Sequence, residues 1–237
     1  MNPPVIVESD IAHLQRRIAG DWSAQFPMPE GFDYEPQTAA SIQALASAKG
    51  VSSSEFAYNL LMANDGMGFI YFPILNYSDG NLDFVKDLLA RDDAVISLSD
   101  GGAHCGTICD AASPTYLLQH WVRDRTRGTV ALAHAIKRQC RDTALLYGLE
   151  DRGLLAPGYL ADVNVIDLAR LKLGKPWLAF DLPAGGKCLL QKAEGYEVTI
   201  KSGEVTFKDG VLQTSRPGRV IRGPQRAAHT PSIPNHS

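Results

Sequence analysis

The chain has 237 residues, 45% of them hydrophobic and 21% charged, which is typical of a globular protein. Its formal net charge of −3 gives no basic surface of the kind that binds nucleic acid or an anionic membrane. No stretch reaches the roughly 18 apolar residues of a membrane span, and the first residues lack a signal peptide. Because four cysteines are too few for a disulfide framework, we expect a cytoplasmic protein with free thiols.

The first hundred residues alternate helical patterns with short apolar runs. Residues 20–37 hold three prolines, two glycines and four aromatic residues, which favours an ordered loop. A helix is predicted between two apolar strands at 69–98, which indicates a parallel β-α-β unit. The predicted elements are strands at 5–7, 69–75 and 94–98, and helices at 8–18, 38–48 with Thr38 as N-cap, from Ser53 or Ser54 onward, and 82–90.

The second half changes character near residue 150. Ser113-Pro114 should begin a helix over 115–125, and a second helix should run from Thr129 to Leu146 and stop at Gly148. After it, alternating apolar residues predict strands rather than helices. These are a strand at 161–167, an antiparallel meander over 196–200, 204–208 and 211–212, and then a disordered tail at 223–237.

One carboxylate, Asp100, stands directly after the apolar run Ala94–Leu98 and before Gly101-Gly102. Chemistry in α/β sheets and barrels collects at the carboxyl ends of buried strands. A charged Asp there needs a cation, several N–H donors or water. Asp100 is therefore either a catalytic or metal-binding residue, or an ordinary turn aspartate that accepts hydrogen bonds from backbone amides.

Other polar residues lie near the same predicted strand ends. His104 either lines the site or is a loop histidine bonded to backbone. Asn76 and Tyr77 end the preceding strand and either face the same opening or form a strand-to-helix turn. Cys105 and Cys109, beside His104 and Asp110, have a spacing seen in zinc sites, but no second pair follows, so small loop cysteines remain the alternative.

Three segments together resemble the D-aminoacylase (N-acyl-D-amino-acid deacylase) group of the amidohydrolase superfamily. They are Ser99–His104, the glycine, proline and aspartate signature Gly148–Asp167, and the hairpin Val198–Val205. The resemblance extends from about residue 35 to residue 222. It implies a metal-dependent (β/α)8 barrel with a small β-sandwich.

The resemblance also implies a role for Asp100. It matches the aspartate that follows the last barrel strand, binds metal and moves a proton from the attacking water to the leaving amine. The complete family site holds one or two Zn²⁺ ions, and zinc lowers the pKa of its bound water to about 7. The family's His-x-His motif is absent from this sequence, and its bridging ligand has no counterpart. Asp100 is thus one ligand where zinc needs three or four.

The substrate-binding arginine of these deacylases follows the aspartate by about ten residues. Here the segment 110–116 has no arginine, and Arg123 and Arg125 lie farther along, in a predicted helix. Guanidinium–carboxylate pairing is the obvious source of selectivity for an N-acyl amino acid. The substrate specificity implied by the resemblance therefore does not carry over directly.

The predicted fold class is α/β: the last strands and helices of a TIM-type metallo-hydrolase barrel (1–150), a small β domain (151–222) and a tail (223–237). The first functional hypothesis is a truncated amidohydrolase fragment for small-molecule linear amides, inactive alone. The alternatives are a non-catalytic remnant or interaction module, and one half of a split enzyme completed by an amino-terminal barrel half. Because a partial barrel exposes strand edges and apolar faces, we expect aggregation or obligate association, including a homo-oligomer.

Overall fold

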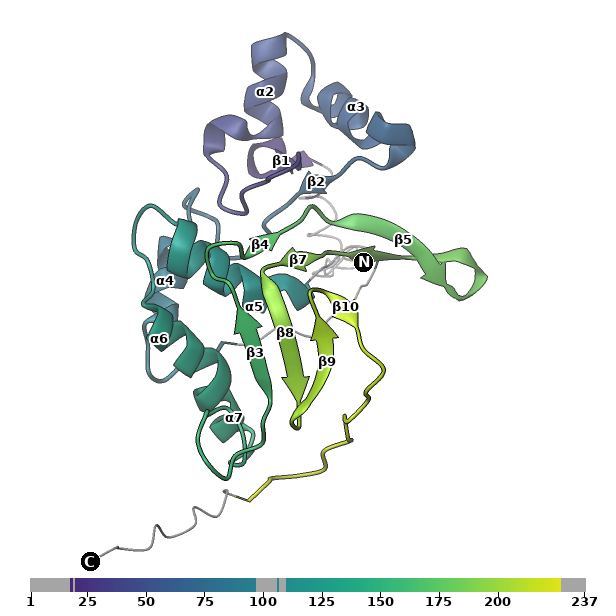
Figure 1. The fold of residues 1–237 in the computed structure, drawn as a ribbon. Coiled ribbons are helices and arrows are strands. Elements are labelled where there is room, and N and C mark those ends of the chain that lie inside the picture. Colours follow the sequence, from purple (N-terminus) through teal and green to yellow (C-terminus); the bar gives the residue numbers. More distant parts are fainter. Residues whose placement is uncertain (1–17, 19, 97–105, 107–109, 227–237) are drawn as a thin grey trace, which may run out of the picture. The chain divides into compact units, whose positions relative to one another are not determined.

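The computed structural model describes residues 18, 20–96, 106 and 110–226. The chain forms two compact units, Met1–Leu82 and Asp83–Ser237, each described by itself below (Figure 1). The predicted strand at 5–7, most of the predicted helix at 8–18, and residues 97–98 of the predicted strand before Asp100 lie outside the described residues. No helix in the described ranges is long and apolar enough to cross a membrane.

The first unit contains two α-helices beside a minimal pair of strands. Its buried residues include Phe26, Ile42 and Tyr77, and the rings of Phe32, Tyr34 and Tyr71 meet edge to face nearby. The aromatic residues of the predicted loop are therefore packed, as expected. The elements are η1 (Trp22–Ala24), β1 (Phe26–Pro27), η2 (Thr38–Ala40), α2 (Ile42–Lys49), α3 (Ser53–Gly66) and β2 (Ile70–Tyr71), where η marks 3₁₀ or π helices.

Serine hydroxyls start both α-helices of this unit, three residues after the predicted cap Thr38 and one residue before the predicted cap Ser53. Ser41 Oγ accepts from the backbone N–H of Ala44, and Ser52 Oγ accepts from that of Glu55, each at 3.2 Å. Thr38 is instead the first residue of η2, so its prediction as N-cap is wrong. Gly50 ends α2 with φ +70°, a left-handed conformation that favours glycine.

The predicted strand at 69–75 is only two residues long and has a different partner from the one expected. β2 pairs antiparallel with β1, Phe26 opposite Tyr71 and Pro27 opposite Ile70. The predicted parallel β-α-β unit is therefore not confirmed. Pro73, which lacks an N–H donor, lies two residues after the end of β2 and does not favour its continuation.

The second unit begins with helices that the sequence largely predicts. Pro114 occupies the first turn of α5, but Ser113 is already helical and Ala112 precedes it without a side-chain cap. One continuous helical run ends before Gly148, whose φ of +68° stops it as predicted. The helices are α4 (Asp83–Leu89), η3 (Asp110–Ala112), α5 (Ser113–Tyr116), η4 (Leu117–Asp124), α6 (Leu132–Ile136), η5 (Lys137–Asp142) and α7 (Thr143–Leu146).

Small antiparallel sheets make up the rest of the second unit. The four-stranded sheet has the order β10-β9-β8-β3 and contains the predicted meander, whereas the pairs β4-β7 and β5-β6 were not predicted. Apart from an isolated parallel bridge between Leu149 and Gln225, the strand pairs of the described chain are antiparallel, so a partial barrel is not confirmed. The strands are β3 (Val163–Ile166), β4 (Lys172–Leu173), β5 (Trp177–Leu182), β6 (Gly186–Leu190), β7 (Ala193–Glu194), β8 (Tyr196–Lys201), β9 (Glu204–Lys208) and β10 (Val211–Leu212).

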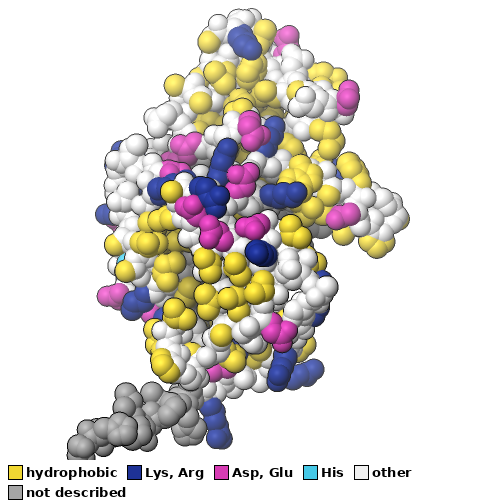
Figure 2. Space-filling model, in the orientation of Figure 1, with side chains coloured by type: hydrophobic (Ala, Val, Ile, Leu, Met, Phe, Trp, Pro, Cys, Tyr) yellow, Lys and Arg dark blue, Asp and Glu magenta, His cyan; other side chains and the backbone are white. Residues whose placement is uncertain are grey.

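Hydrophobic side chains remain in contact with solvent on these sheets. Val165 of β3, and Val205 and Phe207 of β9, are each about two-fifths exposed. Figure 2 shows hydrophobic side chains gathered over the β3, β8 and β9 region of this face. Apolar side chains are therefore part of the solvent-exposed surface of this sheet.

Candidate functional site

The predicted metal-binding and catalytic residue, Asp100, and the neighbouring His104 lie outside the described residues, as do Cys105 and Cys109. Gly106, which is described, lies between Cys105 and Cys109 in the sequence, and a Cβ at this position would lie 3.9 Å from Lys187 Cε. Gly106 therefore lies beside β6.

The described residues do not form a metal site by themselves. No group of three or more His, Cys, Asp and Glu side chains in the described ranges is placed to hold a metal ion. Zinc sites use three or four protein ligands. The described residues alone therefore supply no zinc site, and the predicted ligand Asp100 lies outside them.

Asn76 and Tyr77, the predicted substrate-binding pair, lie in the first unit. Asn76 is exposed and has φ +65°, a turn conformation that asparagine tolerates. Tyr77 is buried, its hydroxyl donates to the carbonyl of Pro36, and its ring meets Phe26 edge to face at 5.8 Å. Burial, with smaller contributions from Glu35 and Asp33, raises the pKa of Tyr77. The Tyr77 side chain therefore serves the core of its unit.

Arg123 and Arg125, the nearest arginines after the predicted site, both have structural partners. Arg123 donates to Asp124 and to the carbonyls of Leu168 and Ala169. The Arg125 side chain is 3% exposed and donates to Asp83, while its guanidinium carbon lies 4.8 Å from the centre of a Trp121 ring. Neither guanidinium replaces the missing carboxylate-binding arginine.

The helix α5–η4 places further polar side chains that the sequence analysis did not single out. His120 is buried and stacks on Tyr116 with ring centres 4.7 Å apart and planes 9° apart. Thr115 Oγ1 lies 2.8 Å from the hydroxyl of Tyr196, which joins this helix to β8. The π geometry of η4 is rare and often marks functional positions. His120 gave only a weak signal in the sequence, because it lies on an otherwise apolar face of the helix.

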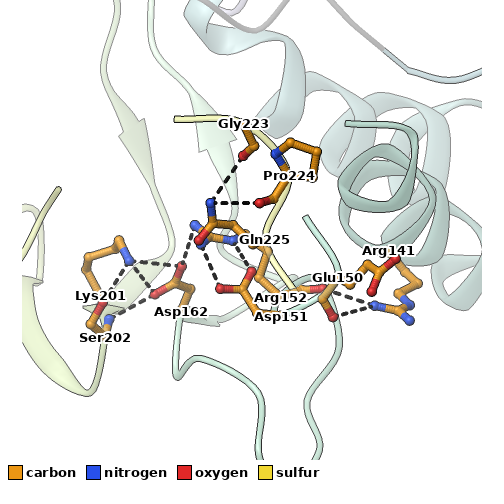
Figure 3. Close-up of polar contacts among 10 residues, drawn as sticks. All are labelled: Arg141, Glu150, Asp151, Arg152, Asp162, Lys201, Ser202, Gly223, Pro224 and Gln225. Atoms are coloured by element: carbon orange, nitrogen blue, oxygen red, sulfur yellow. Dashed lines mark hydrogen bonds and ion pairs between the residues drawn. The ribbon is translucent and has the colours of Figure 1, made fainter. Parts of the chain in front are cut away.

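The signature segment 148–167 carries a connected set of polar contacts (Figure 3). Asp162 accepts from Lys201 Nζ at 2.9 Å and from the backbone N–H of Ser202 at 2.9 Å, and Arg152 Nη1 lies 3.9 Å from its other oxygen. Arg152 also donates to Asp151 at 2.8 Å. These charges join the turn after α7 to the β8–β9 hairpin.

Electrostatics in this network stabilise the charged forms. Hydrogen bonding to Arg152 lowers the pKa of Asp151 below its usual range. The same contact raises the pKa of Arg152. Both groups therefore stay ionised at neutral pH, which suits a structural ion pair rather than proton transfer.

Comparison with known proteins identifies the family. The model of the amidohydrolase family matches residues 28–207, which includes the whole signature segment. No curated protein matches. Similar solved structures are a D-aminoacylase studied for its binuclear metal centre, the D-aminoacylase structure reported as defining a novel subset of amidohydrolases, and a D-aminoacylase mutant in complex with CuCl2.

These structures share 23% identity with the chain, at TM-scores of 0.43–0.44. The similarity covers 81–83% of this chain but only 36–37% of theirs, so the chain spans little more than a third of their length. The resemblance inferred from the sequence is confirmed at the level of the family. By the match over residues 28–207, the chain belongs to the amidohydrolase family.

Proposed function

We propose that the chain supplies the carboxyl-terminal part of a metal-dependent hydrolase that cleaves C–N bonds of linear amides, similar to the N-acyl-D-amino-acid deacylases. The observation that supports this most strongly is the family match, which covers the segments around Asp100 and the signature 148–167. The titles of the similar structures name D-aminoacylase and a binuclear metal centre for those proteins. A small-molecule amide is the corresponding substrate, in a cytoplasmic protein.

In this proposal Asp100 has two roles. It would be one protein ligand of a zinc ion, and it would carry a proton from the attacking water to the nitrogen of the leaving amine. His104 and Asn76 are the proposed substrate-binding residues, whereas the buried side chain of Tyr77 packs in the core of the first unit. The remaining metal ligands and barrel strands come from an amino-terminal barrel half, so the chain alone has no turnover.

Complementation tests this proposal. The full chain is co-expressed with an amino-terminal amidohydrolase fragment that carries a His-x-His strand, and zinc content and amine release from N-acyl-D- and N-acyl-L-amino acids are measured. We expect about one or two zinc ions per complex, and an Asp100→Asn loss of activity of at least about 100-fold. Asp79→Asn, at an exposed turn position, is the matched control and should retain both zinc and activity.

A second candidate is a non-catalytic interaction module. It is favoured by the lack of a three-ligand group in the described ranges and by the structural use of both arginines. If the co-expressed complex forms but contains no zinc, or if Asp100→Asn and Asp79→Asn behave alike, the hydrolase proposal fails and this candidate takes its place.

A further inference from the structure

The carboxyl-terminal part of the described chain crosses back to the signature segment. We call Gly223–Gln225 the strap and Gly148–Glu150 the acceptor edge. The N–H of Gln225 donates to the carbonyl of Gly148 at 2.8 Å, and the N–H of Glu150 donates to the carbonyl of Gln225 at 3.4 Å. Leu149 and Gln225 thus form an isolated parallel β-bridge. The sequence had placed the strap in a disordered tail.

The acceptor edge is held in place by contacts that do not involve the strap. The N–H of Leu149 donates to the carbonyl of Ala144 at 2.8 Å, which ties the edge to α7. From η5, Arg141 Nη1 lies 3.5 Å from the carbonyl of Glu150 and 3.3 Å from that of Arg152. The edge therefore keeps its shape when the strap leaves.

The strap fits the edge closely at one point and is shaped by its own side chain. Gly148 has φ +68°, and a Cβ there would lie 3.0 Å from Pro224 Cβ, so proline packs against the bare glycine. Gln225 Nε2 donates to the carbonyls of Gly223 at 3.1 Å and Pro224 at 3.3 Å, which pre-forms the bend of the strap. The recognised feature is thus a short extended Gly-Pro-Gln peptide.

The strap is held weakly by comparison with the sheet beside it. Residues Gln213–Arg222, which connect β10 to the strap, form no helix or strand, and Val220 is 82% exposed. Segments with few buried contacts open with low free energy while the core stays folded. Ten connecting residues span at most about 33–36 Å, so a released strap has a long reach.

We propose that the acceptor edge is a docking site for an extended Gly-Pro-Gln segment. Within one chain, the strap of that chain occupies the site. In an exchanged dimer, the strap of a second copy occupies it. Backbone hydrogen bonds along the edge supply the affinity, as in peptides that add to a sheet edge. The intramolecular strap competes at an effective concentration in the millimolar range, so exchange is suppressed until the strap is displaced or the protein is concentrated.

A synthetic peptide of residues 219–226 tests the proposal with the full chain. Gln225→Pro removes the N–H that donates to the Gly148 carbonyl, so that the strap no longer occupies the acceptor edge. The matched control, Val220→Pro, places proline at an exposed position for which the described chain shows no backbone bond. For a peptide of about 0.1 mM affinity and a strap at about 1 mM, fluorescence anisotropy should show about tenfold tighter binding to Gln225→Pro than to wild type.

Two further measurements make the outcome decisive. The same peptide with proline at its Gln225 position should bind neither protein, and wild type should gain a dimer in light scattering as its concentration rises towards millimolar. Amide exchange in β8 and β9 checks that each variant remains folded. Equal peptide binding by wild type, Gln225→Pro and Val220→Pro, or equal binding of the two peptides, would overturn the proposal. So would a wild-type protein that stays monomeric throughout.

Discussion

Removing the guanidinium of Arg125 should destabilise the second unit severely. Arg125→Ala deletes hydrogen bonds to the carbonyls of Arg127 at 2.6 Å and Gly128 at 3.3 Å, each contributing about 1.5–3 kcal/mol because the donor is charged. It also removes the contact with Trp121, about 1–2 kcal/mol for a buried cation. The pair with Asp83, whose side chain is 50% exposed, adds at most about 1 kcal/mol. Since these contributions overlap, the expected total is about 3–5 kcal/mol.

Urea unfolding of the full chain, followed by circular dichroism, measures this cost at constant m-value. The matched control is Arg127→Ala: this guanidinium lies 3.5 Å from the same carboxylate but is 62% exposed, so less than about 0.5 kcal/mol is expected. Arg125→Lys keeps the charge but loses the planar fork and should fall between the two. If Arg125→Ala and Arg127→Ala lower stability equally, Arg125 is solvated in solution and the packing argument is wrong.

Three further predictions concern the same unit. Asp162→Ala, which removes the acceptor for Lys201 and the Ser202 N–H, should cost about 1–2 kcal/mol and speed exchange of the Ser202 amide; unchanged exchange would contradict it. Gly195→Ala, with φ +91° and a Cβ 2.6 Å from Leu171 Cα, should cost more than about 2 kcal/mol in urea unfolding, and Gly210→Ala, where nothing lies within 4 Å, about 1 kcal/mol. Hydrogen bonds to Arg152 and Lys137 lower the pKa values of Asp151 and Asp142 in the folded state. Their stabilisation is therefore complete above the unfolded pKa of about 3.9 and is lost as pH falls through the folded values. The unfolding midpoint should be constant from pH 6 to 8 and should decrease when the pH is lowered below about 4. The decrease should be less steep in Asp151→Asn than in wild type, and equal slopes in the two proteins would refute this.

Local sequence signals predicted the parts of the fold that depend on local contacts. The helices Ile42–Lys49 and Asp83–Leu89 follow apolar residues at helical spacing, and the meander follows turns at Ser202-Gly203 and Asp209-Gly210. Cap positions shifted by one residue or more, because several serines and threonines compete and only the backbone path selects among them.

Long-range pairing could not be predicted from these signals. β1 and β2 are two residues each and lie 43 positions apart at Pro27 and Ile70, so neither has a periodicity to detect. β5 and β6 bury little of either face, which removes the alternation that marks a strand. The same holds for the site: Arg123 lies on a helix as predicted, whereas Arg125 is the extended residue that follows its end. Their partners at Leu168 and Asp83 decide that both are structural.

The signature that identifies the family reports the scaffold rather than the chemistry. Asp151 accepts from Arg152, and Asp162 accepts from Lys201 and the Ser202 amide. Position 153 is a glycine because a Cβ there would lie 2.7 Å from the carbonyl oxygen of Cys140. Each of these residues is explained by charge pairing or close backbone approach, with no ligand required. A chain that had lost catalysis would keep them for stability alone. The signature therefore supports the family assignment, and the dependence of zinc binding and amine release on Asp100 tests the hydrolase proposal against the non-catalytic module.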